Sequence, residues 1–187
     1  KNELRSRLRE LDRETERMAE VASLAPFSES VVQLEEARRR MEPVAPERSA
    51  ERLTGIREQI EQTRKSLEKR LGPEKGSGEP VPGRAAARRA AGMVEETRRA
   101  LRRWRDFYSG YDPEVTWWVE QPFQKADKSL GDYASFLRKR LAGYADGEDE
   151  PIIGDPIGRK ALLDALESEM IPYTPEELLE IAEREFA

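Results

Sequence analysis

Apolar and small residues recur at alternating intervals of four and three along much of this chain, and this spacing constrains the fold more than any other feature. In the first segment the stripe consists of Leu4, Leu8, Leu11, Thr15, Met18 and Ala22. Residues with this spacing lie on one face of an α-helix. The pattern therefore predicts a helix from about Asn2 to Ala22.

The same spacing returns in later segments and predicts further helices. We expect them over about Ser28–Arg40, Pro46–Leu71, Arg84–Ser109 and Pro122–Ala142. Ser28 or Ser30 is the expected cap of the second helix, and the long third helix needs a partner such as the first or the fourth. No segment has a convincing strand pattern. The fold class predicted is all-α, an antiparallel bundle of about six or seven helices with long heptad-like seams and no sheet.

Two tryptophans follow a turn at Tyr111–Glu114, where Asp112 is expected to cap a short helical turn. Adjacent positions on a helix point about 100° apart, so Trp117 and Trp118 rarely bury fully in one small core. We expect one of them in the core. The other either packs as well or lines a groove or an interface, and both alternatives remain open.

Glycine, proline and charged residues divide the predicted helices. Residues 72–83 are rich in helix-breaking and small residues and predict a flexible internal linker. Residues 146–150 form an acidic loop. We expect residues 1–187 to form a single helical domain, a fragment of a larger protein, in which residues 152–187 are a carboxy-terminal helix pair that leads into a missing region.

The residues that mark the starts of these two carboxy-terminal helices are the most specific helix signals in the chain. Thr174 and Glu177 have the spacing of a capping box, and Pro175 fits the first helical position. Asp155 before Pro156 is a similar but weaker start. Because Pro172 disfavours helical geometry at the residue before it, the first helix of the pair is expected to end near Met170.

Composition narrows the classes of function. The net charge of −5, from 33 basic and 38 acidic residues, argues against a general nucleic-acid binder. The chain has no cysteine, which excludes disulfides and mildly favours the cytoplasm. No apolar run is long enough to span a bilayer, and the residues after Lys1 contain no signal-peptide core, although an export signal lost with the native start stays open. We therefore expect neither a membrane nor a nucleic acid as a partner.

The chain also lacks histidine, so the usual catalytic triads and zinc sites cannot be built from it. We expect no catalytic residue, no metal ligand and no cofactor within it. The acidic loop does not have the spacing of a calcium-binding loop, and a solvated loop is the simpler interpretation. The fourth helix carries many arginines, which indicate either a face that follows phosphates or a salt-bridged exterior.

Three long strings resemble one bacterial family. GDPIGRKALLDALESEMIPYTPEELLEIAEREF, YDPEVTWWVEQPF and LAPFSESVVQLEEARRRMEP are similar to stretches of the domain-of-unknown-function 885 family, large helical proteins regarded as zinc-metallopeptidase-like. The family's H-E-x-x-H helix is absent here. The resemblance implies an amino-terminal, non-catalytic helical part of a metallopeptidase-like hydrolase that forms a wall or lid of the substrate cleft. Its implied partners are the remainder of its own parent protein and a peptide substrate, with zinc possible in the missing region.

Within the carboxy-terminal pair, Asp155, Arg159 and Tyr173 are the candidate substrate-binding residues. Helix starts offer unpaired amides, and Arg159 adds a fork of donors one turn in, which suits a peptide or an acidic ligand. A purely structural role for the three residues remains open. A stand-alone helical module that binds another protein is the alternative function.

Overall fold

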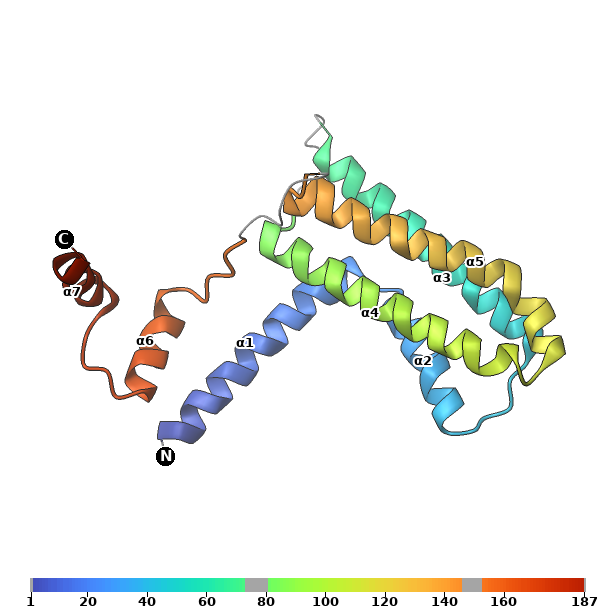
Figure 1. Ribbon diagram of the computed structural model, residues 1–187, viewed down its shortest axis with the longest axis horizontal. Coiled ribbons are helices and arrows are strands. Elements are labelled where there is room, and N and C mark those ends of the chain that lie inside the picture. The colour runs from blue at the N-terminus through green and yellow to red at the C-terminus, as the bar shows by residue number, and fades with distance from the viewer. Residues whose placement is uncertain (1, 73–80, 146–152, 187) are drawn as a thin grey trace. The chain divides into compact units, whose positions relative to one another are not determined.

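The computed structural model describes residues 2–72, 81–145 and 153–186, and every regular element in them is a helix (Figure 1). The α-helices are α1 (Asn2–Leu24), α2 (Ser28–Arg39), α3 (Pro46–Leu71), α4 (Arg84–Ser109), α5 (Pro113–Phe136), α6 (Arg159–Ser168) and α7 (Pro175–Phe186). A π-helical segment, η1 (Leu137–Ala142), continues α5. The described residues contain no strand, which confirms the all-α prediction. None of the described helices combines the length and the apolar character needed to span a bilayer.

The chain divides into two compact units. Unit 1 is Lys1–Met18 together with Gly154–Ala187, and unit 2 is Ala19–Ile153. Helix α1 begins in unit 1 and ends in unit 2. That the whole chain folds as one domain stays a prediction. Most of the predicted linker and all of the predicted acidic loop lie outside the described residues.

The core of unit 2 lies where α3, α4 and α5 pack together, with α2 against α4. Buried positions on these helices alternate between intervals of three and four. On α4 they include Ala87, Ala90, Val94, Thr97, Leu101, Trp104 and Tyr108. On α5 and η1 they include Val119, Phe123, Ala126, Leu130, Tyr133 and Leu137. The helix limits predicted for α3 and α4 are confirmed, and the inner face of α4 ends on Tyr108, next to the exposed Phe107.

The three long helices of unit 2 alternate in direction along the chain (Figure 1). Helices α4 and α5 are joined by a short turn and run antiparallel. Helices α3 and α5 consequently run in the same direction, and α5, not α1, is the long partner of α3. A strictly antiparallel arrangement therefore does not describe this pair.

One predicted helix boundary is wrong. The sequence suggests a short turn at the tryptophans and a new helix at Pro122, but α5 is continuous from Pro113 and contains Pro122 in its interior. Asp112 caps this whole helix, because its carboxylate accepts from the amides of Glu114 and Val115 at 3.0 and 3.1 Å. Buried residues on both sides of the proline lie on one face, and their packing offsets the missing N–H.

The cap predicted for α2 is also wrong. Phe27 is the N-cap residue, and no side chain caps this helix. The hydroxyl of Ser28 instead accepts a hydrogen bond from Thr97 on α4 at 3.0 Å. Phe27 is fully buried, with its ring 5.6 Å from that of Tyr133 in an edge-to-face contact. Packing against α4 and α5 therefore decides where α2 begins.

In unit 1, the structure confirms one start signal and corrects the other. The amide of Thr174 donates to Glu177 at 2.7 Å, and the amide of Glu177 donates back to the Thr174 hydroxyl at 3.3 Å, which is the predicted capping box. Helix α6, however, begins at Arg159 and not at Pro156, since Gly158 at its N-cap has φ of +82°. Asp155 does not cap it, and its carboxylate lies 3.7 Å from Arg17 of α1.

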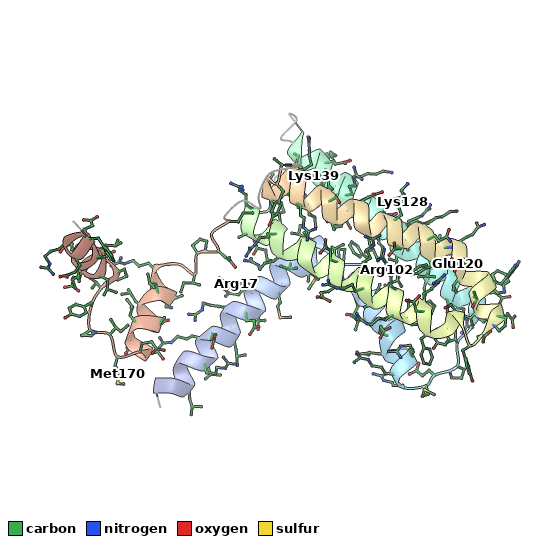
Figure 2. All side chains as sticks on the ribbon, viewed as in Figure 1. Arg17, Arg102, Glu120, Lys128, Lys139 and Met170 are labelled. Atoms are coloured by element: carbon green, nitrogen blue, oxygen red, sulfur yellow. The ribbon has the colours of Figure 1, made fainter. Side chains whose placement is uncertain are left out.

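Two helices end on a methionine in the left-handed region. Met41 after α2 has φ of +57°, and Met170 after α6 has φ of +56°. In each case the next amide, that of Glu42 or Ile171, donates to a carbonyl five residues earlier, which is the bonding pattern of a Schellman motif. Met170 projects from this turn in Figure 2. A proline follows each motif and prevents the helix from continuing.

The apolar stripe of α1 is exposed. Leu4, Leu8, Leu11 and Met18 all lie on the surface, with Leu4 72% exposed. The polar face of α1 lies beside α6, where Arg9 donates to Asp164. The periodicity of this segment therefore predicts its helix correctly but not the burial of its stripe.

Candidate functional site

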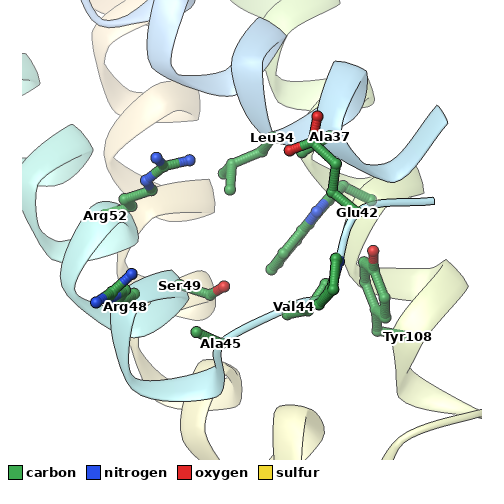
Figure 3. Close-up of a pocket in the computed structure, with 11 residues that line it drawn as sticks. Leu34, Ala37, Glu42, Val44, Ala45, Arg48, Ser49, Arg52 and Tyr108 are labelled. Atoms are coloured by element: carbon green, nitrogen blue, oxygen red, sulfur yellow. The ribbon is translucent and has the colours of Figure 1, made fainter. Parts of the chain in front are cut away.

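One cavity of unit 2 lies between the α2–α3 loop, the first two turns of α3 and the last turns of α4 (Figure 3). Its volume is about 260 Å³. Apolar walls come from Leu34 and Ala37 of α2 and from Val44 of the loop. Trp104 and Tyr108 line it from α4, one turn apart on the buried face. We call this space the α3 cavity.

Three buried polar groups face the α3 cavity. Ser49, Trp104 and Tyr108 line it and are 7%, 1% and 8% exposed. Figure 3 shows the Ser49 hydroxyl pointing from α3 into the space toward Val44 and Tyr108. Within the described part of the chain, none of the three side chains has a hydrogen-bond partner. Their polar atoms are not among the fully buried unsatisfied ones, so water in the cavity can satisfy them and a polar ligand can replace that water.

Two arginines flank the same cavity. Arg48 and Arg52 are one turn apart on α3, and both are exposed. Neither forms an ion pair with any described residue. Glu42 lies at the opposite edge, and its carboxylate is 3.8 Å from Arg40. The charged residues lining the cavity therefore sum to +1, from Arg48 and Arg52 minus Glu42.

Helix α3 also begins at this cavity. Ala45, its N-cap residue, lines the cavity and has no side chain that can cap, and Pro46 occupies the first helical position. The amides of the first turn are therefore left without a capping side chain. A helix start of this kind carries a partial positive charge, which adds to that of the two arginines.

The phenol of Tyr108 is protonated at neutral pH, because its ordinary pKa of about 10 is already well above 7. Burial raises the pKa of Tyr108 above its ordinary value, the positive charge of Arg38 opposes the shift, and the charge of Glu35 adds to it. Its hydroxyl is consequently a hydrogen-bond donor throughout the neutral range. With the serine hydroxyl, the indole N–H and the guanidinium groups, the cavity offers mainly donors.

The predicted substrate-binding residues lie elsewhere, in unit 1. Arg159 donates to Glu176 and thereby links α6 to α7. Its hydrogen bond lowers the pKa of the Glu176 carboxyl. Tyr173 is 48% exposed in the turn before α7, and Asp155 lies near Arg17. The structure thus gives Arg159 a structural contact, while substrate contact by the three residues stays a prediction.

Trp117 and Trp118 differ in burial, as expected for adjacent side chains that point about 100° apart on a helix. Trp118 is partly buried against the core of unit 2, and Trp117 is 75% exposed. Their rings meet edge to face with centroids 5.1 Å apart. Trp118 also lines a shallow depression on α3 beside Gly55 and Thr54. An interface role for these residues stays a prediction.

Most arginines of α4 form the salt-bridged exterior that was one of the two interpretations. Arg98 and Arg102 both donate to Asp127 of α5, with four contacts of 2.6 to 2.9 Å. Arg105 donates to Glu120 at 2.8 Å, and Figure 2 labels Arg102 on α4 and Glu120 on α5. These ion pairs connect the two antiparallel helices along their length.

Residues suited to hold a metal are not brought together in the parts of the chain that the structure describes. A zinc site of the usual kind needs imidazole or thiolate ligands, and the sequence contains neither histidine nor cysteine. The residues present therefore cannot form a zinc site of the usual kind, and a zinc in a further part of the protein, as the family resemblance implies, stays a prediction.

Two residue pairs in the sequence point to the α3 cavity, although neither is among the predicted site residues. Arg48 and Arg52 have helical spacing directly after a proline start, and Trp104 and Tyr108 have the same spacing on α4. Each pair by itself is typical of an ordinary helix. Only the packing of α3 beside α4 brings the two pairs to one place.

Comparison of this chain with known proteins identifies no homologue. No protein-family model matches the chain, and neither a curated protein nor a solved structure matches it. Membership of the domain-of-unknown-function 885 family accordingly stays a prediction from the three strings, and the function must be argued from the residues.

Proposed function

We propose that this chain is the amino-terminal, non-catalytic helical part of a metallopeptidase-like hydrolase and forms a wall or lid of its substrate cleft. One observation carries the proposal. In unit 1, α6 and α7 are amphipathic, yet Ala161 is their only buried residue among those described. Exposed apolar residues on these helices and the turns beside them include Ile157, Leu162, Leu163, Tyr173, Leu179 and Phe186. A helix pair of this kind is completed by packing against a further part of the same protein.

Unit 2 supports this proposal as a rigid body. Its burial spacing on α3, α4 and α5 suits shallow, heptad-like seams. Four cross-helix contacts to Asp127 and the Arg105–Glu120 pair add polar connections between α4 and α5. A bundle with these features provides a stable wall. The zinc and the catalytic residues then belong to another part of the enzyme, and a peptide is the substrate.

The native gene tests the proposal directly. A coding sequence that continues beyond Ala187 and encodes an H-E-x-x-H helix supports it, and a stop codon at that point contradicts it. The chain described here is expected to have no peptidase activity. Activity of the purified chain that persists with a chelator would also contradict the proposal.

The role of Arg159 is tested in the longer, active enzyme with two matched variants, Arg159→Ala and Glu176→Ala. If Arg159 binds substrate, its loss lowers kcat/KM more than about tenfold, or 1.4 kcal/mol, with little change in melting temperature. Glu176→Ala breaks the same ion pair but spares the guanidinium, so it serves as the control. Equal effects of the two variants on kcat/KM assign Arg159 to the scaffold.

The alternative function is a stand-alone module that binds another protein, and the exposed stripe of α1 favours it. Leu4, Leu8 and Leu11 give one helical face that a partner helix can cover. Replacing all three with serine abolishes partner binding under this alternative. The same substitutions leave the peptidase activity of the longer enzyme unchanged if α1 has no partner.

A further inference from the structure

The α3 cavity is built for an acceptor that the chain itself does not supply. Its polar groups come from three sources that pack against one another: the serine hydroxyl of α3, the indole and phenol of α4, and the guanidinium groups of α3. All of these donate, and the one acidic residue at the edge, Glu42, lies beside Arg40. A ligand that occupies this space must present hydrogen-bond acceptors to these groups, and a carboxylate presents two oxygens.

Charge and walls define the ligand further. The lining charge of +1 suits a monoanion better than the dianion of phosphate. Leu34, Val44 and the ring of Trp104 add apolar surface to the lining, which fits a molecule with an apolar body as well as an anionic end. The volume of about 260 Å³ lies just below the usual range for organic ligands and leaves no space for a nucleotide.

We propose that the α3 cavity binds a small organic carboxylate, with its oxygens held by Ser49, Arg48 and Arg52 near the start of α3 and its apolar body against Trp104. The guanidinium groups lie at the edge of the cavity in Figure 3. Because they have no ion-pair partner among the described residues, they can turn toward a carboxylate without breaking an existing contact. Planar guanidinium groups pair well with carboxylates. This site is in unit 2 and does not depend on the function proposed above.

The indole N–H of Trp104 reports on the cavity. The chain has three tryptophans, so Trp117→Phe and Trp118→Phe assign the indole resonance of Trp104 in a nitrogen–proton NMR spectrum. Benzoate is the probe, benzamide is its uncharged counterpart, and inorganic phosphate is the second anion. All titrations are made at constant ionic strength, because exposed arginines respond to salt. Benzoate is expected to move the Trp104 resonance in a saturable manner, and the other two compounds at least about tenfold more weakly.

Matched variants locate the binding. Arg48→Gln with Arg52→Gln is expected to weaken benzoate binding at least about tenfold, and Ser49→Ala about threefold, because they remove charged and neutral donors respectively. Arg88→Gln with Arg103→Gln is the control, since these exposed arginines of α4 lie outside the cavity and the charge change is the same. Thermal unfolding of each variant shows that the fold is intact.

Several results would overturn the proposal. They are the absence of a saturable shift with benzoate, equal binding of benzamide, or equal loss of binding in the control pair of arginine variants. Phosphate that binds as tightly as benzoate overturns the assignment to carboxylates and indicates a general anion site. Persistence of benzoate binding in the Arg48→Gln, Arg52→Gln protein excludes the guanidinium groups as its basis.

Discussion

Units 1 and 2 are built from the same kind of amphipathic helix, but only unit 2 buries its apolar faces. Among the described residues, every buried hydrophobic side chain except Ala161 belongs to unit 2. Leu101 of α4 is completely buried, whereas Leu179 of α7 is 64% exposed. The spacing of leucines in a sequence therefore predicts helices equally well in both units. It does not predict which of their faces find a partner.

The difference extends to what holds each unit together. Helices α6 and α7 have 10 and 12 residues, which is short for a helix that lacks tertiary packing. Unit 1 relies on the Thr174–Glu177 capping box and on polar contacts between its helices, Arg159–Glu176 and Arg9–Asp164. Unit 2 has a packed core, and most helical stability in proteins comes from such packing.

The largest effect is expected from a matched pair of leucine truncations. Leu101→Ala leaves a cavity in the core of unit 2 and should lower the free energy of unfolding by about 2–5 kcal/mol. Leu179→Ala removes an exposed side chain and should change it by less than about 0.5 kcal/mol. Urea unfolding measures both. Equal losses would mean that α7 is packed in solution, and the contrast between the units would fail.

A smaller effect is expected at Asp127, which connects α4 to α5. Asp127→Asn should destabilise the protein by about 1–3 kcal/mol at neutral pH, because it weakens charged hydrogen bonds from Arg98 and Arg102. Asp132→Asn, on the same helix and exposed without a partner among the described residues, is the control and should have almost no effect.

The carboxylate of Asp127 should also make the stability of unit 2 depend on pH in the acid range. Burial by itself would raise the pKa of Asp127, but hydrogen bonds from Arg102 and Arg98 outweigh it and hold the pKa well below its usual range. Its contribution is therefore present above the unfolded pKa of about 3.9 and is lost as the pH falls further. The difference between wild type and Asp127→Asn should shrink below about pH 4. A constant difference in urea unfolding across this range would show that the two arginines do not stabilise the charged form.

Cap removal should separate local from global stability. Thr174→Ala is expected to cost about 0.5–2 kcal/mol, seen as faster amide exchange in α7 with no change in the unfolding of unit 2. Asp112→Ala removes the cap of α5 and should cost a similar amount, but in the cooperative unfolding of unit 2. If Thr174→Ala also shifts that transition, the two units unfold together.

The smallest predicted effect is an increase in stability. Met41→Gly should stabilise unit 2 by about 0.5–1 kcal/mol, because glycine adopts the left-handed conformation without the cost that a Cβ imposes. Met170→Gly should act in the same direction but only on α6 in unit 1. Thermal unfolding and amide exchange measure the two. Met41→Ala keeps the Cβ and is the control, so an equal gain from alanine would attribute the effect to loss of the exposed side chain.

Much of the helical structure was predictable because its signals are local. The limits of α3 and α4, the start of α7, the Asp112 cap and the Thr174–Glu177 capping box follow from proline, glycine and polar residues at fixed positions. The predictions that were wrong involve competition with packing. Pro122 did not end a helix because buried residues on both sides hold it together, and Ser28 did not cap α2 because its hydroxyl contacts Thr97.

The candidate site was less predictable. The local sequence of one segment predicts Asp155, Arg159 and Tyr173 as site residues, whereas the α3 cavity joins residues more than fifty positions apart, such as Ser49 and Trp104. Neither partner has an unusual local pattern. Their proximity depends on how α3 and α4 pack.

By itself, the sequence determined that this chain is helical, where most of its helices start and stop, and that residues 1–187 supply no histidine or cysteine chemistry. Helix periods and caps act over a few residues, so one chain is enough to identify them. Only the tertiary structure decided which stripes are buried, that Asp127 joins two arginines, and that Ser49, Trp104 and Tyr108 face one cavity without side-chain hydrogen-bond partners among the described residues. These features arise from contacts between distant segments, and the free energy of such contacts is set by packing rather than by local preference.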